Sequence, residues 1–100
     1  MTKAYWINTF RTIKDPAKVA AYAELAGPAM AAGGGRFLAR GLPVAAFESG
    51  SIERTTLIEF PSAEAAVATY RSPAYREALA VLGDGAERDV RIIEAAAEAT

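Results

Sequence analysis

The chain contains no histidine and no cysteine among its 100 residues. Without histidine there is no imidazole general base, no Ser-His-Asp triad and no histidine-ligated haem or metal. Without cysteine there is no disulfide framework, no thiolate nucleophile and no zinc–thiolate site. Any chemistry must therefore come from carboxylates, arginine, tyrosine, asparagine, serine or threonine, or from a cofactor supplied from outside. We expect neither a resident cofactor nor a metal.

An excess of charge and a long apolar run are also lacking. Eleven basic and twelve acidic residues leave a net charge of −1, and there is no basic stripe of the kind that binds nucleic acid. No apolar run approaches the roughly 20 residues of a membrane span, and the N-terminus lacks the apolar core of a signal peptide. The default expectation is one cytoplasmic domain over residues 1–100, with neither nucleic-acid nor membrane partners.

What is present is a set of short, strongly apolar strand patterns. In the segment Thr55–Phe60, alternate positions place Leu57 on one face and Ile58 on the other, and neither face is clearly polar. The segment Ala4–Arg11 has the same character. A strand that is apolar on both sides is normally covered on both sides. One chain of this length is unlikely to supply both covers, which points to a partner subunit.

Helix-capping residues, prolines and glycines define the limits of the remaining elements. Helices are expected to begin at Asp15-Pro16 and at Ser62, because each has a side-chain acceptor at the N-cap. Glycines at 33–35 and 83 end them, Ser72-Pro73 interrupts the second helix, and Pro28 is expected to bend or interrupt the first. A brief strand is conceivable at 44–47, and the tail after Glu94 is expected to fray. The predicted strands cover residues 4–11, 36–40, 53–60 and 89–94.

The order strand, helix, strand, strand, helix, strand predicts an α+β ferredoxin-like fold. Its four-stranded antiparallel sheet has the first and third strands at the centre and both helices on one face. The other face is apolar here, and exposed apolar patches of that size usually mark an interface. We therefore predict a homodimer that forms through the sheet face.

Five segments together resemble one protein family: Tyr5-Trp6-Ile7, Tyr22-Ala23, Gly34 to Gly41, Ile58 to Ser62 and Ser72 to Tyr75. The chain is similar, over nearly its whole length, to the domain of unknown function 1330 family, which resembles the dimeric α+β barrel superfamily. The resemblance implies two ferredoxin-like sheets paired into a barrel, and relatives that include cofactor-independent monooxygenases, small isomerases and haem-handling enzymes. The lack of histidine counts against a haem enzyme.

Charged residues on two strands are the first site candidates. Arg36 and Arg40 are expected to share a strand face, where they can hold a carboxylate ligand through bidentate contacts. Alternatively, they protect a sheet edge and pair with Glu53 or Glu59. Glu59 lies between apolar neighbours, where a carboxylate can act as an acid or base. Its alternative role is an ion pair with Arg36 or Arg40 that sets strand register.

Aromatic residues and one amide are the second set of candidates. Trp6 and Asn8 share a strand face, and an indole beside an amide can form the floor of a pocket for a small aromatic or quinone-like molecule. Plain core packing is the alternative. Tyr22 and Tyr75 lie on helix stripes that face the sheet, and their hydroxyls need partners if they are buried. They can line a helix–sheet cavity or simply pack in the core.

These candidates support three functional hypotheses. The first is a small enzyme or binding protein for a carboxylate or aromatic molecule, with Glu59 abstracting a proton and Arg40 stabilising an oxyanion if it is an isomerase. The second is cofactor-independent oxygenation of an electron-rich aromatic substrate. The third is a non-catalytic dimeric module, which requires no polar-studded cavity.

Overall fold

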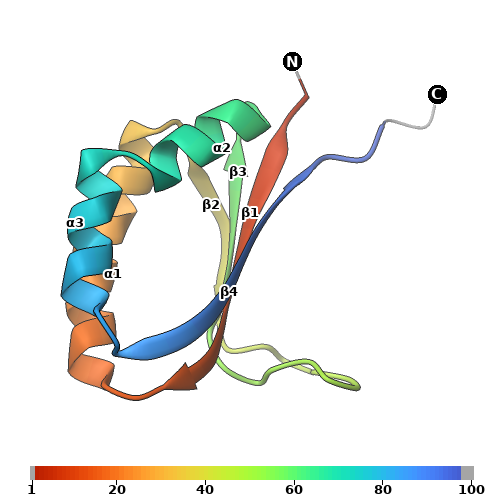
Figure 1. Ribbon diagram of the computed structural model, residues 1–100. Helices are drawn as coiled ribbons and strands as arrows, with labels where there is room; N and C mark the ends of the chain where they lie inside the picture. Colours follow the sequence, from red (N-terminus) through yellow and green to blue (C-terminus); the bar gives the residue numbers. More distant parts are fainter. Residues whose placement is uncertain (1, 98–100) are drawn as a thin grey trace.

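The computed structural model describes residues 2–97, and its helices and strands are labelled in Figure 1. The chain alternates between strands and helices in the predicted order. The elements are β1 (Ala4–Ile13), α1 (Pro16–Ala32), β2 (Arg36–Gly41), β3 (Thr55–Phe60), α2 (Ala63–Tyr70), α3 (Pro73–Leu82) and β4 (Ala86–Glu94).

The four strands form one sheet in the order β2-β3-β1-β4. Every neighbouring pair is antiparallel. The predicted ferredoxin-like arrangement with β1 and β3 at the centre is therefore confirmed. Figure 1 shows all three helices on one side of the sheet. The other side, called the open face below, is free of helices in the described part of the chain.

Each helix begins where a side chain satisfies its free backbone donors. The Asp15 carboxylate accepts hydrogen bonds from the Ala17 and Lys18 N–H groups at 3.0 and 3.3 Å. Ser62 caps α2 and Ser72 caps α3 in the same way. Because Ser72-Pro73 restarts the helix, the predicted second helix is two helices, as its interruption signal indicated.

Several local predictions need correction, beginning with two strand bounds: β1 continues to Ile13, two residues beyond its predicted end, and β3 begins at Thr55 rather than at residue 53. The helix α1 is continuous from Pro16 to Ala32, so Pro28 does not interrupt it. Pro28 lies near the C-terminal end, where the missing N–H removes a single helical hydrogen bond. Residues 44–47 form no strand but belong to the loop between β2 and β3. The strand β4 begins at Ala86, three residues earlier than predicted.

The ends of the described chain are tied together beside the sheet. The Ala95 N–H donates to the Lys3 carbonyl at 2.8 Å, which extends the pairing of β1 with β4. The last part of the tail, residues 98–100, lies outside the described residues. Within residues 2–97, the helices lack the combination of length and apolar character that crossing a membrane requires.

The two faces of the sheet are formed by alternating residues of the central strands. Trp6 and Phe10 of β1 and Ile58 of β3 are buried beneath the helices and belong to the hydrophobic core. Ile7 and Leu57 pair across the two strands and lie half-buried on the open face. The open face is thus apolar at its centre, as the strand patterns predicted.

A β-bulge in β2 separates the two arginines of this strand. Arg36 lies opposite Glu59, on the open face, whereas Arg40 lies opposite the buried Thr56, on the helix-covered face. The pairing register shifts between them. One extra residue reverses the side to which every later residue of a strand points. The prediction that Arg36 and Arg40 share a face is therefore wrong.

Candidate functional site

A pocket lies between α1 and the helix-covered face of the sheet. Its volume is about 440 Å³, which falls within the range of small-molecule sites. The helix α1 forms one wall, β1 and β3 form the floor, and β2 and the adjoining loop close one side. Four of the seven predicted site residues meet in this region: Trp6, Asn8, Tyr22 and Arg40 all line the pocket.

The pocket exists because α1 presents small side chains to it. Ala20, Ala23, Ala26 and Gly27 recur along the pocket side of the helix. A Cβ atom added to Gly27 would meet no other atom within 4 Å. Such short side chains do not reach the sheet, so space remains between the two layers. The sequence shows this feature as the alanine-rich stretch of the first helix.

Trp6 and Asn8 place polar groups in the otherwise apolar floor. Both side chains are almost completely buried, with 0% and 5% of their surfaces exposed. The indole Nε1 of Trp6 and the Oδ1 of Asn8 have no hydrogen-bond partner among residues 2–97. A buried polar atom without a partner costs about 1–3 kcal/mol. Because both residues line the pocket, an unpaired donor and an unpaired acceptor lie in the layer of side chains that forms its floor.

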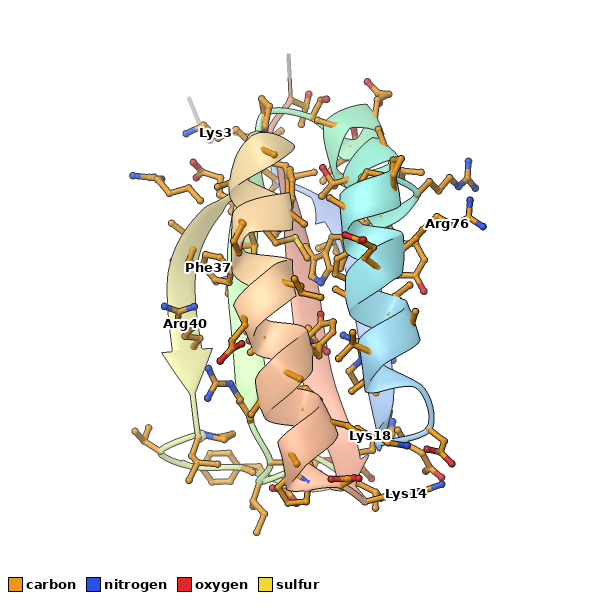
Figure 2. The ribbon with its side chains drawn as sticks, turned by 90° about the vertical axis from the view of Figure 1, so that its left-hand side faces the viewer. Lys3, Lys14, Lys18, Phe37, Arg40 and Arg76 are labelled. Carbon is orange, nitrogen blue, oxygen red and sulfur yellow. The ribbon has the colours of Figure 1, made fainter. Side chains whose placement is uncertain are left out.

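The mouth of the pocket carries charge. Arg40 projects from β2 beside α1 (Figure 2), and its guanidinium carbon lies 4.7 Å from the centre of the Phe37 ring. Glu53 and Arg54, at the end of the loop before β3, line the same region. Within residues 2–97, neither Arg40 nor Arg54 forms an ion pair. Arg54 was not among the predicted site residues, and the sequence pattern placed it inside the predicted strand 53–60, whereas β3 begins at Thr55.

Tyr22 and Tyr75 meet on the far side of the pocket, where they form a hydrogen-bonded cluster with Arg88. The two hydroxyl oxygens are 2.6 Å apart. The Arg88 Nη1 donates to the Tyr22 oxygen at 2.8 Å and to the Tyr75 oxygen at 3.2 Å. Tyr22 lines the pocket, whereas Tyr75 lies behind it and is fully buried.

Arg88 is a site residue that sequence reasoning missed. It shares a face of β4 with Val90 and Ile92, both of which pack against the core. The fourth strand was predicted to begin at residue 89, so Arg88 was not considered as a strand residue facing the core. Burial raises the pKa of the Tyr75 hydroxyl well above its ordinary value of 10.0, and the adjacent Tyr22 raises it further, although Arg88 acts in the opposite direction. Tyr75 therefore remains protonated at neutral pH.

Glu59 and Arg36 lie away from the pocket, on the open face. The Arg36 Nη2 is 3.2 Å from Glu59 Oε1, and the Lys3 Nζ is 3.6 Å from Glu59 Oε2. The pairing of Glu59 with Arg36 corresponds to the register-setting alternative. Because Glu59 and Arg40 occupy opposite faces, the two side chains are not brought together within one subunit. Among residues 2–97, no three acidic side chains cluster to hold a metal ion.

The fold and the pocket together define a ferredoxin-like α+β protein with a cavity between its helix layer and its sheet. The family model described as "Domain of unknown function (DUF1330)" matches residues 3–96. The chain belongs to this family. None of the curated proteins matches the chain in sequence.

Solved structures share the fold at low sequence identity. The protein of unknown function RPA0582 from Rhodopseudomonas palustris is 20% identical, with a TM-score of 0.72 over 97% of this chain and 85% of that one. A dimeric ferredoxin-like protein of unknown function from Thermobifida fusca is 18% identical, with a TM-score of 0.67 over 94% and 92% of the two chains. SnoaB, a cofactor-independent oxygenase from Streptomyces nogalater, is 12% identical, with a TM-score of 0.68 over 98% and 97%.

Proposed function

We propose that the protein binds a small organic molecule, aromatic or carboxylate in character, in the pocket beneath α1. The observation that carries this proposal is that two residues lining a mainly apolar cavity, Trp6 and Asn8, each hold a buried polar atom without a partner, Nε1 and Oδ1. An empty apolar cavity needs no polar atoms, and buried polar groups are normally paired. A ligand with an apolar skeleton and hydrogen-bonding groups supplies the missing partners.

The charges at the pocket mouth favour a ligand with an acidic group. Arg40 and Arg54 contribute two positive charges there, against one negative charge from Glu53. A guanidinium group matches the planar geometry of a carboxylate with two parallel donors. The ligand that fits best therefore places its ring over Asn8 and its acidic group at the β2 side of the pocket.

Binding experiments with single-site variants test this proposal. We expect a calorimetric titration with small aromatic acids, such as benzoate and 4-hydroxybenzoate, to show saturable binding. The change Arg40→Ala should weaken binding about tenfold or more, because a charge-assisted hydrogen bond contributes about 1.5–3 kcal/mol. Arg76→Ala is the matched control, since Figure 2 shows this arginine on α3, on the side away from Arg40. Equal losses in both variants would contradict a site at Arg40.

Proton transfer is the enzymatic form of this proposal. Glu53 is the only carboxylate among residues 2–97 that lines the pocket, whereas Glu59 is tied to Arg36 on the open face. A base acting on a ligand held in this pocket is therefore Glu53, with Arg40 placed to stabilise an oxyanion. Loss of turnover in Glu53→Gln, with full turnover in Glu59→Gln, is the expected result. The reverse result would return the role to Glu59.

A second candidate is cofactor-independent oxygenation, which the structural similarity to SnoaB favours. In that reaction an electron-rich aromatic substrate supplies the electrons itself. Trp6 and Asn8 line the pocket, and an indole beside an amide supports the binding of such a ring there. Oxygen consumption with phenolic substrates, measured with an oxygen electrode and lost in Asn8→Leu, would support this candidate. Turnover without oxygen consumption would support proton transfer instead.

We further propose that the protein is a homodimer paired through the open face. That face carries Ile7 and Leu57 at its centre, and Figure 1 shows the loop between β2 and β3 projecting on the same side. The loop exposes Val44, Phe47 and Ile52, of which Val44 is fully exposed. A second copy is the economical occupant, since a two-fold axis pairs the same apolar surface with itself.

A further inference from the structure

In the cluster of Tyr22, Tyr75 and Arg88, one phenolic O–H has no hydrogen-bond acceptor among residues 2–97. The two phenols carry two O–H protons, and one of them forms the 2.6 Å bond between the two oxygens. Each oxygen also accepts a bond from Arg88. The second phenolic proton finds no acceptor among residues 2–97. The cluster therefore contains one unpaired O–H donor, called the spare donor.

The spare donor belongs to Tyr22. Tyr75 is fully buried and does not line the pocket, whereas Tyr22 does. Because burial keeps Tyr75 protonated, it can donate to the Tyr22 oxygen. That oxygen then accepts from both Tyr75 and Arg88. The hydrogen of Tyr22 is left free, and the pocket that Tyr22 lines offers it a place for an acceptor.

Arg88 gives the Tyr22 hydroxyl an unusual electrostatic setting. Its guanidinium carbon lies 4.8 Å from the centre of the Tyr22 ring, and no carboxylate among residues 2–97 forms an ion pair with it. Arg88 is half-buried, and a charged side chain that is partly withdrawn from water normally has an anionic partner. Here its positive charge acts on the Tyr22 oxygen, which strengthens the hydroxyl as a donor to negative charge.

We propose that Tyr22 donates a hydrogen bond to the oxygen of a phenol, enol or corresponding anion bound in the pocket, with Tyr75 and Arg88 as positioning residues. The inference rests on the proposed binding function and adds the chemical class of the ligand, a planar hydroxyaromatic or enolic molecule. Tyr22 lies toward α3 and β4, whereas Arg40 lies on β2 at the opposite edge of the sheet. The two contacts therefore recognise two different groups of one ligand.

A pair of probes that differ in one group separates this contact from the rest of the pocket. The probes are 4-nitrophenol, whose phenolate absorbs visible light, and 4-nitrotoluene, which replaces the hydroxyl by a methyl group. Calorimetry gives the dissociation constant of each probe for the full chain. The variants are Tyr22→Phe and, as a matched control, Tyr70→Phe, whose side chain contacts Trp6 but does not line the pocket.

We expect Tyr22→Phe to bind 4-nitrophenolate about tenfold less tightly, the loss of one charge-assisted hydrogen bond. It should bind 4-nitrotoluene as the natural chain does, which also shows that the variant is folded. Tyr70→Phe should change neither constant. The visible absorption of the phenolate also reports the pKa of bound 4-nitrophenol. In Arg88→Lys and Tyr75→Phe, this pKa should lie closer to its value in free solution, because both changes weaken the hydrogen bonds that the Tyr22 oxygen accepts.

Two results would overturn the inference, and they can be told apart. If Tyr22→Phe binds both probes as the natural chain does while Arg40→Ala loses 4-nitrophenolate, the phenolate oxygen lies at Arg40; the pocket function stands and the role of Tyr22 falls. If the natural chain binds neither probe at millimolar concentration, the proposed pocket function fails and the inference falls with it.

Discussion

Asn8 places a carboxamide where the rest of its strand face is apolar. Its neighbours on that face are Trp6 and Phe10, both buried. The amide oxygen has no partner among residues 2–97, so the folded protein carries the cost of its desolvation. Residues that lower stability in this way are typical of binding sites, where a ligand later supplies the missing bond.

We therefore expect Asn8→Leu to make the protein more stable and less functional. A side chain of similar size without polar atoms removes the unpaired group, so the free energy of unfolding should rise by about 1 kcal/mol or more. Ligand binding should be lost. Urea denaturation and calorimetric titration measure the two effects.

Thr69→Val is the matched control for this change. The Thr69 hydroxyl is also buried, but it donates to the Ala65 carbonyl at 2.8 Å. Removal of this satisfied group should lower the free energy of unfolding by about 1 kcal/mol. A stability loss of the same size in Asn8→Leu would show that the Asn8 amide is satisfied in the folded protein, and would remove the main support for the ligand site.

At the scale of the element, α1 combines a capped start with a pocket side made of small residues. The cap at Asp15 and the buried Tyr22 and Met30 hold the helix on the sheet. Between these anchors, the alanines and Gly27 do not reach the floor, so the gap between the helix backbone and the sheet stays unfilled. The helix therefore sets the depth of the pocket.

Substitutions at Gly27 should separate helix stability from pocket volume. Gly27→Ala is expected to raise the free energy of unfolding by about 0.5–1 kcal/mol, since glycine is a poor residue within a helix and the added methyl group meets no atom within 4 Å. Gly27→Leu should fill the pocket and weaken ligand binding at least tenfold. Ala31→Leu, at an exposed position of the same helix, should leave binding unchanged. Unchanged binding in Gly27→Leu would place the ligand elsewhere.

The start of α1 is also tied to the turn before β4 by an exposed ion pair. Lys18 Nζ lies 2.8 Å from Asp84 Oδ1. This hydrogen bond lowers the pKa of Asp84 below its ordinary 3.8 and raises that of Lys18 above its ordinary 10.5. The carboxylate thus stabilises the fold above pH 3.8 and loses this effect as the pH falls through its lowered pKa. The lysine stabilises the fold below pH 10.5 and loses this effect as the pH rises through its raised pKa.

A comparison of melting temperatures across pH tests the pair. The natural chain should melt at a higher temperature than Asp84→Asn by a small, constant margin between these two limits, because surface ion pairs contribute little. The margin should vanish at both extremes of pH. A difference that grows in acid would contradict this account.

At the scale of the whole molecule, the two sides of the sheet differ in what covers them. Figure 1 shows the helix layer covering one side of the sheet, where the pocket lies. The open side presents the half-buried apolar residues of β1 and β3, and its charged residues form ion pairs near both ends of the strands. These pairs join Arg36 with Glu59, and Arg11 and Arg91 with Asp89. A surface of this composition suits a self-complementary contact better than water.

If the open face is the dimer contact, a charged residue introduced there should prevent dimer formation. Sedimentation velocity at micromolar concentration should give twice the mass of one chain. Leu57→Asp should give a folded monomer, because pairing would bury an uncompensated carboxylate at the centre of the contact. Val81→Asp, at an exposed apolar position on α3, should remain a dimer. A natural chain that sediments as a monomer would refute the proposal.

Short-range signals in the sequence determined the order and limits of most elements. These signals are the helix caps at Asp15, Ser62 and Ser72 and the apolar residues of the central strands. Each acts on residues close to it in the chain, so the ferredoxin-like arrangement could be predicted from them. Trp6, Asn8 and Tyr22 were also found in this way, as polar or aromatic residues on faces that had to be buried.

Only the tertiary structure decided which of these residues share a site. The bulge in β2 reversed Arg40 relative to Arg36, and counting alternate residues works only along a regular strand. The bond between Tyr22 and Arg88 joins residues 66 positions apart, and no local pattern records such a contact. The register of the strands and the packing of α1 on the sheet bring Tyr22 and Arg40 to one pocket and leave Arg36 on the other face, and both depend on the whole chain at once.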